Sequence, residues 1–257
     1  MTVLSAVSRD GFLGNQLMID QPLSGSHRAG LDAVLLAASL PDGTTGHVVD
    51  LGAGVGVAGL AAAHRLPETT VTLVEIDQEL ARLAEGNAAM NASTANRVHV
   101  VVADVLAPAA ERRAAGLLDN MADHVVMNPP FHPADRGRSS PSPARARAHA
   151  VTADAIDGWV RAAAAALKPS GTLTVVFRAD ELPRLFSAIG SRFGSLALLP
   201  IHARAGEAAH RLILRGRPQG RAPLRILPGI VLHAPDGSFR SDVEAVLRGA
   251  ALPVSWW

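Results

Sequence analysis

The sequence predicts an α/β protein in which helices cover both faces of a mostly parallel sheet. Short runs rich in β-branched residues alternate with Ala- and Leu-rich stretches of helical period, an alternation typical of this fold class. The 257 residues can form one large domain with its own core, but they are too few for two full domains. Glycines follow the first predicted strand and acidic residues stand at the ends of the first three, where an open parallel sheet gathers its ligand-binding groups.

The strands and helices of this sheet can be placed along the chain. We expect strands at 47–51, 70–76, 98–105, 124–127, 172–178, 196–203 and 210–217. Helical stretches lie between them, near 56–65, 77–91, 154–168 and 180–190. Because only residues 204–209 separate the last two strands, these two should pair as an antiparallel hairpin at one edge of the sheet.

Residues 1–45 differ from the rest and predict a cap made of a hairpin and a helix. The pair Gly14-Asn15 stands between apolar residues, which is a hairpin signal, and residues 30–40 form an apolar helical stretch. Residues 46–257 then form the sheet domain. Within it, the segment 136–149 is rich in Ser, Pro and Arg and has no periodicity, so it predicts a long loop of the kind that is usually functional.

Composition excludes several classes of protein. The 24 basic residues against 23 acidic ones give no overall positive field, so any surface for nucleic acid must be local. The lack of cysteine excludes disulfides, cysteine-based zinc sites and thiol chemistry. No metal-ligand spacing such as H-E-x-x-H occurs, so we expect no metal. We also expect a cytoplasmic protein, since no signal peptide or membrane-length apolar run is present.

A glycine-rich turn follows the first predicted sheet strand, with the sequence DLGAGVG at 50–56. Glycines permit a sharp turn into the next helix and let a ligand lie against bare backbone beside the positive helix end. Residues 54–59 also satisfy G-x-G-x-x-G, so an NAD-dependent oxidoreductase is a competing hypothesis. A tight turn that needs glycine only for packing is the structural alternative.

Acidic residues mark the ends of the first three strands, and parallel strand ends project into one crevice. Glu75 could accept hydrogen bonds from both hydroxyls of a ribose, and Asp104 could accept one from the exocyclic amine of an adenine. Asp50 beside the glycines disfavours a pyrophosphate but favours a ligand with positive charge. An adenosine ligand with a cationic end and no phosphate is S-adenosylmethionine. Each acid taken alone could equally be a helix cap or a solvated charge.

The fourth strand ends in Asn128-Pro129-Pro130-Phe131. An amine on an aromatic base is a poor nucleophile, because its lone pair is delocalised into the ring. The Asn128 carboxamide oxygen and the Pro129 carbonyl could accept both amine hydrogens and aim the lone pair at a methyl group. The prolines stiffen the loop, and Phe131 offers a face for stacking an extruded base, worth roughly 1–3 kcal/mol. The alternative is that these residues only mark a turn.

Together these motifs resemble the class I S-adenosylmethionine-dependent methyltransferases with an N-P-P-[FY] motif. Their Rossmann-like fold has seven strands with the last one antiparallel. The chain is similar in particular to bacterial enzymes that methylate N6 of an adenosine beside the anticodon of valine tRNA. That similarity is carried, in order, by HRAGLDAVLL at 27–36, VVDLGAGVG at 48–56, VEID at 74–77, NPPF at 128–131, AAHR at 208–211 and IVLHAPDGSFR at 230–240.

The resemblance implies a role for each matching residue. It implies an S-adenosylmethionine site formed by Arg28, Asp32, Asp50, Gly52, Gly54, Glu75, Asp104 and Asn128. It implies a catalytic group that addresses the base, formed by Asn128, Pro129, Pro130 and Phe131. The expected substrate is RNA, first of all adenine N6 in tRNA.

Two other substrates and one other function stay open. The pair Phe131-His132 also resembles the N-P-P-F-H of ribosomal RNA guanine-N2 methyltransferases, and protein glutamine methyltransferases share N-P-P-Y. A cofactor-binding module without catalysis is the other function. The oligomeric state and the roles of Trp256 and Trp257 are open as well. Arginines that could form either a phosphate track or an ordinary solvated surface are Arg136, Arg138, Arg145, Arg147, Arg204, Arg211, Arg215, Arg217, Arg221 and Arg225.

Overall fold

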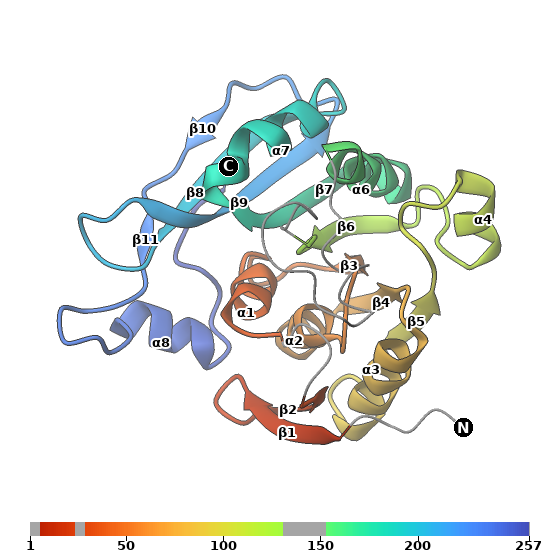
Figure 1. The fold of residues 1–257 in the computed structure, drawn as a ribbon, viewed down its shortest axis with the longest axis horizontal. Helices are drawn as coiled ribbons and strands as arrows, with labels where there is room; N and C mark the ends of the chain where they lie inside the picture. The colour runs from red at the N-terminus through yellow and green to blue at the C-terminus, as the bar shows by residue number, and fades with distance from the viewer. Residues whose placement is uncertain (1–5, 24–28, 131–152, 257) are drawn as a thin grey trace, which may run out of the picture.

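The computed structural model describes residues 6–23, 29–130 and 153–256. In this part of the chain, a nine-stranded sheet lies between two layers of helices, and a separate two-stranded hairpin packs beside it (Figure 1). The strands are β1 Val7–Phe12, β2 Leu17–Pro22, β3 Gly46–Leu51, β4 Thr69–Glu75, β5 Val98–Val102, β6 Ala122–Met127, β7 Leu167–Arg178, β8 Phe193–His202, β9 Ala209–Pro218, β10 Arg225–Ile226 and β11 Ile230–Val231. The helices are α1 Leu31–Ala38, α2 Val57–Arg65, α3 Gln78–Met90, α4 Ala109–Ala114, α6 Ala153–Ala166, α7 Leu182–Ile189 and α8 Ser241–Leu247, with a 3₁₀ turn η1 at Ala179–Glu181.

The order of the strands in the sheet is β10-β8-β9-β7-β6-β3-β4-β5, with β11 also on β8. β9 runs antiparallel to both of its neighbours, and the other pairs are parallel. The predicted α/β class is therefore confirmed, with an antiparallel last long strand. β8 and β9 pair as predicted, but they are not the edge of the sheet, because β10 and β11 lie outside β8.

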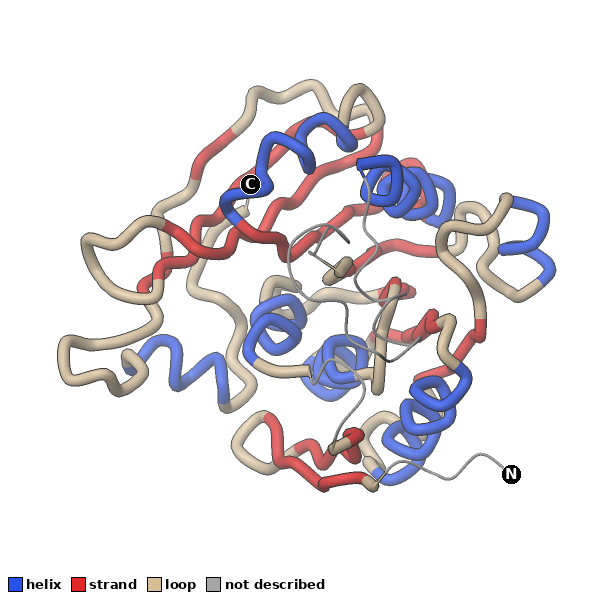
Figure 2. Tube along the Cα trace, in the orientation of Figure 1, coloured by secondary structure: helices blue, strands red, loops and turns tan. Residues whose placement is uncertain are grey.

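Alternating side chains of the strands build two hydrophobic cores. Val48 and Val126 face the layer of α1 and α2, whereas their neighbours Val49 and Val125 face α6 and α7 on the opposite side. Successive side chains of a strand point to opposite faces, so a sheet covered on both sides needs apolar residues throughout. Figure 2 shows helices on the two sides of the sheet, as the sequence predicts.

The cap expected at 1–45 contains the predicted hairpin and helix. β1 pairs with β2 in antiparallel register, and α1 packs against α2 in the first core. The division into a cap and a 46–257 domain stays a prediction, and the segment 136–149 lies outside the described residues. No helix in the described ranges is long and apolar enough to cross a membrane.

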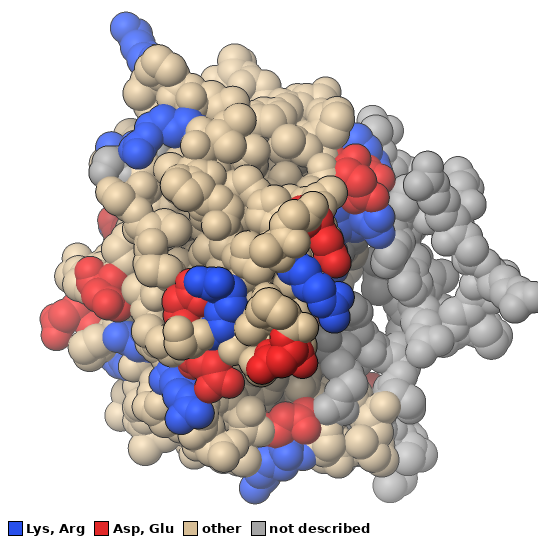
Figure 3. Space-filling view, turned by 90° about the vertical axis from the view of Figure 1, so that its left-hand side faces the viewer, with Lys and Arg blue, Asp and Glu red and all other residues tan. Residues whose placement is uncertain are grey.

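Surface charge is mixed on the face that contains α8. Basic and acidic side chains lie next to one another there (Figure 3). At the two ends of α8, Arg248 and Glu244 approach to 3.3 Å, and Arg240 approaches Asp242 to 3.4 Å. Neighbouring charges of opposite sign largely cancel at a distance, so the described side chains around α8 form a mixed surface and not a basic patch.

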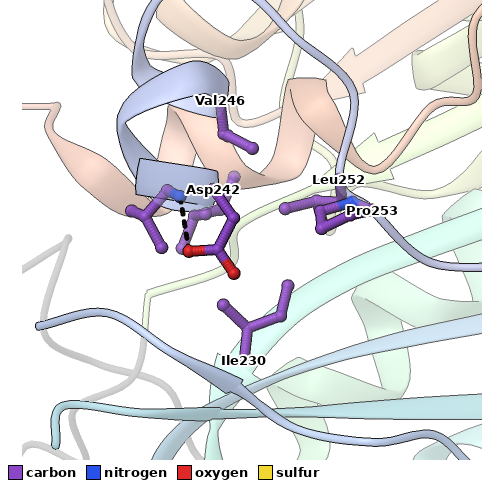
Figure 4. Close-up of a pocket in the computed structure, with 7 residues that line it drawn as sticks. Ile230, Asp242, Val246, Leu252 and Pro253 are labelled. Carbon is purple, nitrogen blue, oxygen red and sulfur yellow. Dashed lines mark hydrogen bonds between the residues drawn. The ribbon is translucent and has the colours of Figure 1, made fainter. Parts of the chain in front are cut away.

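The C-terminal segment packs onto the first core through α8 and the residues after it. Figure 4 shows the apolar seam beneath α8, with Ile230, Val246, Leu252 and Pro253 turned toward one another. The seam has no room for a ligand, so it serves packing. The Leu252 amide donates a 2.8 Å hydrogen bond to the Ala38 carbonyl, which fixes this segment against the end of α1.

Trp256 ends this packed segment inside the core. Its side chain is 4% exposed, and the Arg215 guanidinium lies 5.1 Å from its ring centroid, a distance suited to cation–π attraction. Trp256 therefore packs within its own chain, and Trp257 lies outside the described residues. Arg215 is itself only 2% exposed, so the expectation of a surface arginine or phosphate ligand at this position is wrong.

Truncation of Trp256 tests this packing. We expect Trp256→Ala to lower the free energy of unfolding by about 3 kcal/mol, because it removes a buried aromatic ring and leaves a cavity. Trp256→Phe keeps most of the buried area and should lose less. Urea unfolding followed by circular dichroism measures both, and equal stabilities for all three proteins would show that the ring is not part of the core.

Candidate active site

The carboxyl ends of four neighbouring strands form the edge of the sheet at which the predicted residues meet. Leu51 at the end of β3 pairs with Val74 on β4 and with Met127 on β6. Glu75 pairs with Val102 at the end of β5. The glycine turn after β3 therefore lies between Glu75 on one side and Asn128 on the other, with Asp104 beyond Glu75.

The glycine turn adopts backbone conformations that need glycine. Gly52 and Gly54 have φ of +71° and +58°, in the left-handed region that side chains disfavour. A Cβ on Gly52 would lie 2.4 Å from the Trp159 ring, whereas a Cβ on Gly54 would meet nothing within 4 Å. Gly52 thus allows α6 to pack closely, and Gly54 leaves bare backbone facing open space.

Glu75 fastens this turn to the end of β4. Its Oε2 accepts a 2.8 Å hydrogen bond from the Gly54 amide, and its Oε1 accepts a 2.9 Å bond from the Asp77 amide. The side chain is 7% exposed, and this burial raises the pKa of the Glu75 carboxyl above its usual value. The structure thus brings Glu75, Gly52 and Gly54 together, as the sequence predicts.

Asp50 lies in the same region, but it has a backbone partner. Its Oδ2 accepts a 2.9 Å hydrogen bond from the Gly59 amide in the first turns of α2. Burial raises the pKa of the Asp50 carboxyl to about 7, and the nearby negative charge of Glu75 adds to the effect. The carboxylate thus braces the strand against α2, and its predicted contact with a cationic ligand stays a prediction.

The remaining predicted cofactor residues lie at the two sides of the crevice. Asp104 is exposed, and its Oδ1 accepts a 2.8 Å hydrogen bond from the Leu106 amide. Asp32, in the first turn of α1, forms a 2.9 Å ion pair with Nε of Arg211 on β9. This pair ties the start of α1 to the carboxyl edge of the sheet. Arg28 lies outside the described residues.

The carboxamide oxygen of Asn128 is one of five buried side-chain atoms without a hydrogen-bond partner among the described residues, and it lies directly after β6, next to the glycine turn. Pro129 beside it is buried, and Phe131 lies outside the described residues. An unsatisfied buried acceptor costs about 1–3 kcal/mol, so native proteins rarely keep one without a functional reason.

Three apolar residues of the site were missed by the sequence analysis. Ile76, directly after Glu75, is 56% exposed, and Leu106, two residues after Asp104, is 47% exposed. Trp159 covers Gly52, and a Cβ on the preceding Gly158 would lie 2.6 Å from Leu106, so α6 closes this side of the crevice. An apolar residue directly after the strand-end acid Glu75 was the available signal for Ile76.

The described ranges contain no group of three or more His, Asp or Glu side chains arranged to hold a metal ion. What the crevice does offer is a carboxylate at the end of β4, open glycine backbone, exposed apolar side chains and an unsatisfied carboxamide oxygen.

Comparison with known proteins identifies the family. The family model "Methyltransferase small domain" matches residues 27–199. The chain belongs to this family. Two relatives are tRNA1(Val) (adenine(37)-N6)-methyltransferases, one from Porphyromonas gingivalis, 30% identical over 91% of this chain and 91% of the relative, and one from Aeromonas hydrophila, 31% identical over 89% and 92%. A solved structure described as a predicted O-methyltransferase from Agrobacterium tumefaciens is 33% identical, with a TM-score of 0.73 over 86% of this chain and 97% of that chain.

The predicted class I methyltransferase family and fold are thereby confirmed, and the protein is an enzyme of methyl transfer. The competing hypotheses of an NAD-dependent oxidoreductase and of a module without catalysis are set aside. The glycine pattern at 54–59, which also matches dinucleotide-binding proteins, here lies within the region that matches the methyltransferase family.

The pKa of Asp50 predicts how stability depends on pH. Because this pKa is raised from 3.8 to about 7 in the folded protein, the folded state binds the proton more tightly than the unfolded chain does. Stability is therefore lost as the pH rises from the unfolded value of 3.8 through the folded value of about 7. The isosteric variant Asp50→Asn has no carboxyl to titrate and lacks this loss. Its free energy of unfolding, relative to that of wild type, should therefore rise by about 2 kcal/mol from about pH 5 to about pH 8. Urea unfolding at several pH values measures the difference, and a constant difference would contradict the buried, raised pKa.

Proposed function

We propose that this methyltransferase transfers the methyl group of S-adenosylmethionine to N6 of an adenine in tRNA. The observation that carries the proposal is the buried carboxamide oxygen of Asn128, which has no hydrogen-bond partner among the described residues. It lies at the end of β6, next to the glycine turn of β3, since Met127 and Leu51 are register partners. An exocyclic amine bound here would supply the missing hydrogen-bond donor.

The crevice fits an adenosine cofactor. Glu75 would accept the two ribose hydroxyls, and Gly54 leaves its backbone open for close approach. The exposed side chains of Ile76 and Leu106 would hold the flat adenine. The Asp104 carboxylate could accept a hydrogen bond from the exocyclic amine of this adenine. When bound, the cofactor supplies an electrophilic methyl group on a cationic sulfur.

The same geometry favours an amine over a hydroxyl as the acceptor. The Asn128 oxygen and the Pro129 carbonyl would each accept one amine hydrogen, which holds the nitrogen lone pair toward the methyl group. An amine sheds its proton to water after the transfer, so no strong base is needed. A hydroxyl must give up its single proton, and a carboxamide is too weak a base to take it.

The choice of tRNA rests on the relatives. Proteins about 30% identical along nine tenths of the chain carry the name of an enzyme acting on adenine 37 of tRNA1(Val). We propose the same class of substrate here and, with it, a cytoplasmic location. Guanine N2 in ribosomal RNA and the amide nitrogen of a protein glutamine would use the same two acceptors, so the substrate has to be measured.

Incubation with tritiated S-adenosylmethionine and separated tRNA, ribosomal RNA and protein fractions tests the proposal. We expect label in tRNA, recovered as N6-methyladenosine after digestion to nucleosides. Label confined to ribosomal RNA or to protein would overturn the tRNA assignment while leaving the methyl transfer intact.

Removal of the Asn128 carboxamide tests its role. We expect Asn128→Ala to lower kcat by about a hundredfold or more, the usual cost of losing one group that orients or stabilises the reacting atoms. The dissociation constant for S-adenosylhomocysteine, measured by calorimetry, should change little. Asn96→Ala, at an exposed asparagine before β5, is the matched control and should behave as wild type. Full turnover by Asn128→Ala would remove this residue from the mechanism.

A further inference from the structure

Two asparagines, Asn87 on α3 and Asn91 directly after its last residue, hold the N-terminal hairpin in place. They are four positions apart, so they share one face of the helix, and they are 1% and 8% exposed. Asn91 accepts a 2.9 Å hydrogen bond from the Met18 amide and donates a 2.8 Å bond to the Met18 carbonyl. Asn87 likewise accepts a 2.8 Å hydrogen bond from the Asp20 amide and donates a 3.1 Å bond to the Asp20 carbonyl.

The two carboxamides thus take the place of a neighbouring strand along the open edge of β2. β1 pairs with β2 on one side only, so the amides and carbonyls of Met18 and Asp20 would otherwise lack partners at this interface. In this respect Asn87 and Asn91 are equivalent, and losing either should weaken the docking of the hairpin to a similar degree.

The two carboxamides differ in their third hydrogen bond. The Nδ2 of Asn91 donates a 2.7 Å bond to the Asn87 carbonyl, which is local to α3. The Nδ2 of Asn87 instead donates a 3.0 Å bond to the Val55 carbonyl, inside the glycine turn. Val55 directly follows Gly54, whose amide is held by Glu75. The turn is therefore fixed from two sides, by a carboxylate on β4 at the Gly54 amide and by a carboxamide on α3 at the Val55 carbonyl.

We propose that Asn87 is a positioning residue that sets the cofactor-binding conformation of the glycine turn and couples it to the docked hairpin. The proposal rests on the proposed S-adenosylmethionine site. Without the bond to the Val55 carbonyl, the Val55–Gly56 peptide keeps only the 2.9 Å hydrogen bond from the Gly56 amide to the Ala53 carbonyl. This peptide can then rotate more easily, because a glycine stands on each side of Val55. The turn would then spend part of its time in conformations that do not fit the cofactor.

The hairpin extends this coupling to the start of α1. Gln21, next to Asp20 on β2, is 2% exposed, and its Oε1 accepts a 2.9 Å hydrogen bond from the Ala29 amide. The helix that begins at Leu31 carries Asp32 at the edge of the crevice. One connected set of buried carboxamides therefore joins the glycine turn, the hairpin and the segment before α1.

Comparison of Asn87→Ala with Asn91→Ala separates positioning from simple stability. Both variants lose hydrogen bonds to β2, so both melting temperatures should fall by similar amounts. Calorimetric titration with S-adenosylhomocysteine should show a dissociation constant about three- to tenfold higher for Asn87→Ala, as expected for one lost hydrogen bond, and unchanged for Asn91→Ala. With unfractionated tRNA as substrate, KM for S-adenosylmethionine should rise in Asn87→Ala alone, while kcat at saturation and KM for tRNA stay within about twofold of wild type.

The outcomes are distinct. Equal effects of the two variants on S-adenosylhomocysteine affinity, or no effect of either, would overturn the positioning role. Failure of the wild-type protein to bind S-adenosylhomocysteine would instead contradict the proposed function. If Asn87→Ala does not fold, Asn87→Ser serves in its place, since its short hydroxyl cannot span Asp20 and Val55 together and the same rise in the dissociation constant is expected.

Discussion

The parallel pairing of β3 with β4 and β6 is the constraint on which the site depends. Adjacent strands lie about 4.8 Å apart, so the end of β3 has the ends of its two neighbours directly beside it. Leu51 is thereby matched with Val74 and Met127, and the glycine turn, Glu75 and Asn128 follow within a residue of these partners. The polarity of three strands thus brings together backbone, carboxylate and carboxamide that lie far apart along the chain.

Holding these groups at the crevice costs stability. Asp50 and Glu75 are both buried carboxylates with raised pKa values, and the Asn128 oxygen has no partner in the described part of the chain. Backbone amides offset part of this cost, since Gly59 donates to Asp50 while Gly54 and Asp77 donate to Glu75. Functional sites commonly keep groups that would be better satisfied elsewhere, because the ligand completes them.

The sequence predicts the sheet and the strand-end residues well, because both follow from local pattern. Runs of β-branched residues locate the long strands, and an acid or asparagine at a strand end must lie at the carboxyl edge of a parallel sheet. The partners of these residues depend on packing between distant segments. Asp32 meets Arg211 only because β9 inserts between β7 and β8, and Asn87 reaches Val55 only because α3 packs beside the glycine turn. The predicted strand at 98–105 ends earlier, at Val102, because Asp104 starts a turn through the Leu106 amide.

A crystal structure of the protein with S-adenosylhomocysteine tests the central claim most directly. The account predicts both ribose hydroxyls within about 3.2 Å of the Glu75 carboxylate, with the ligand sulfur beside the glycine turn and facing the Asn128 carboxamide. A ligand seated with its ribose away from Glu75, or with Asn128 turned away from the sulfur, would contradict it.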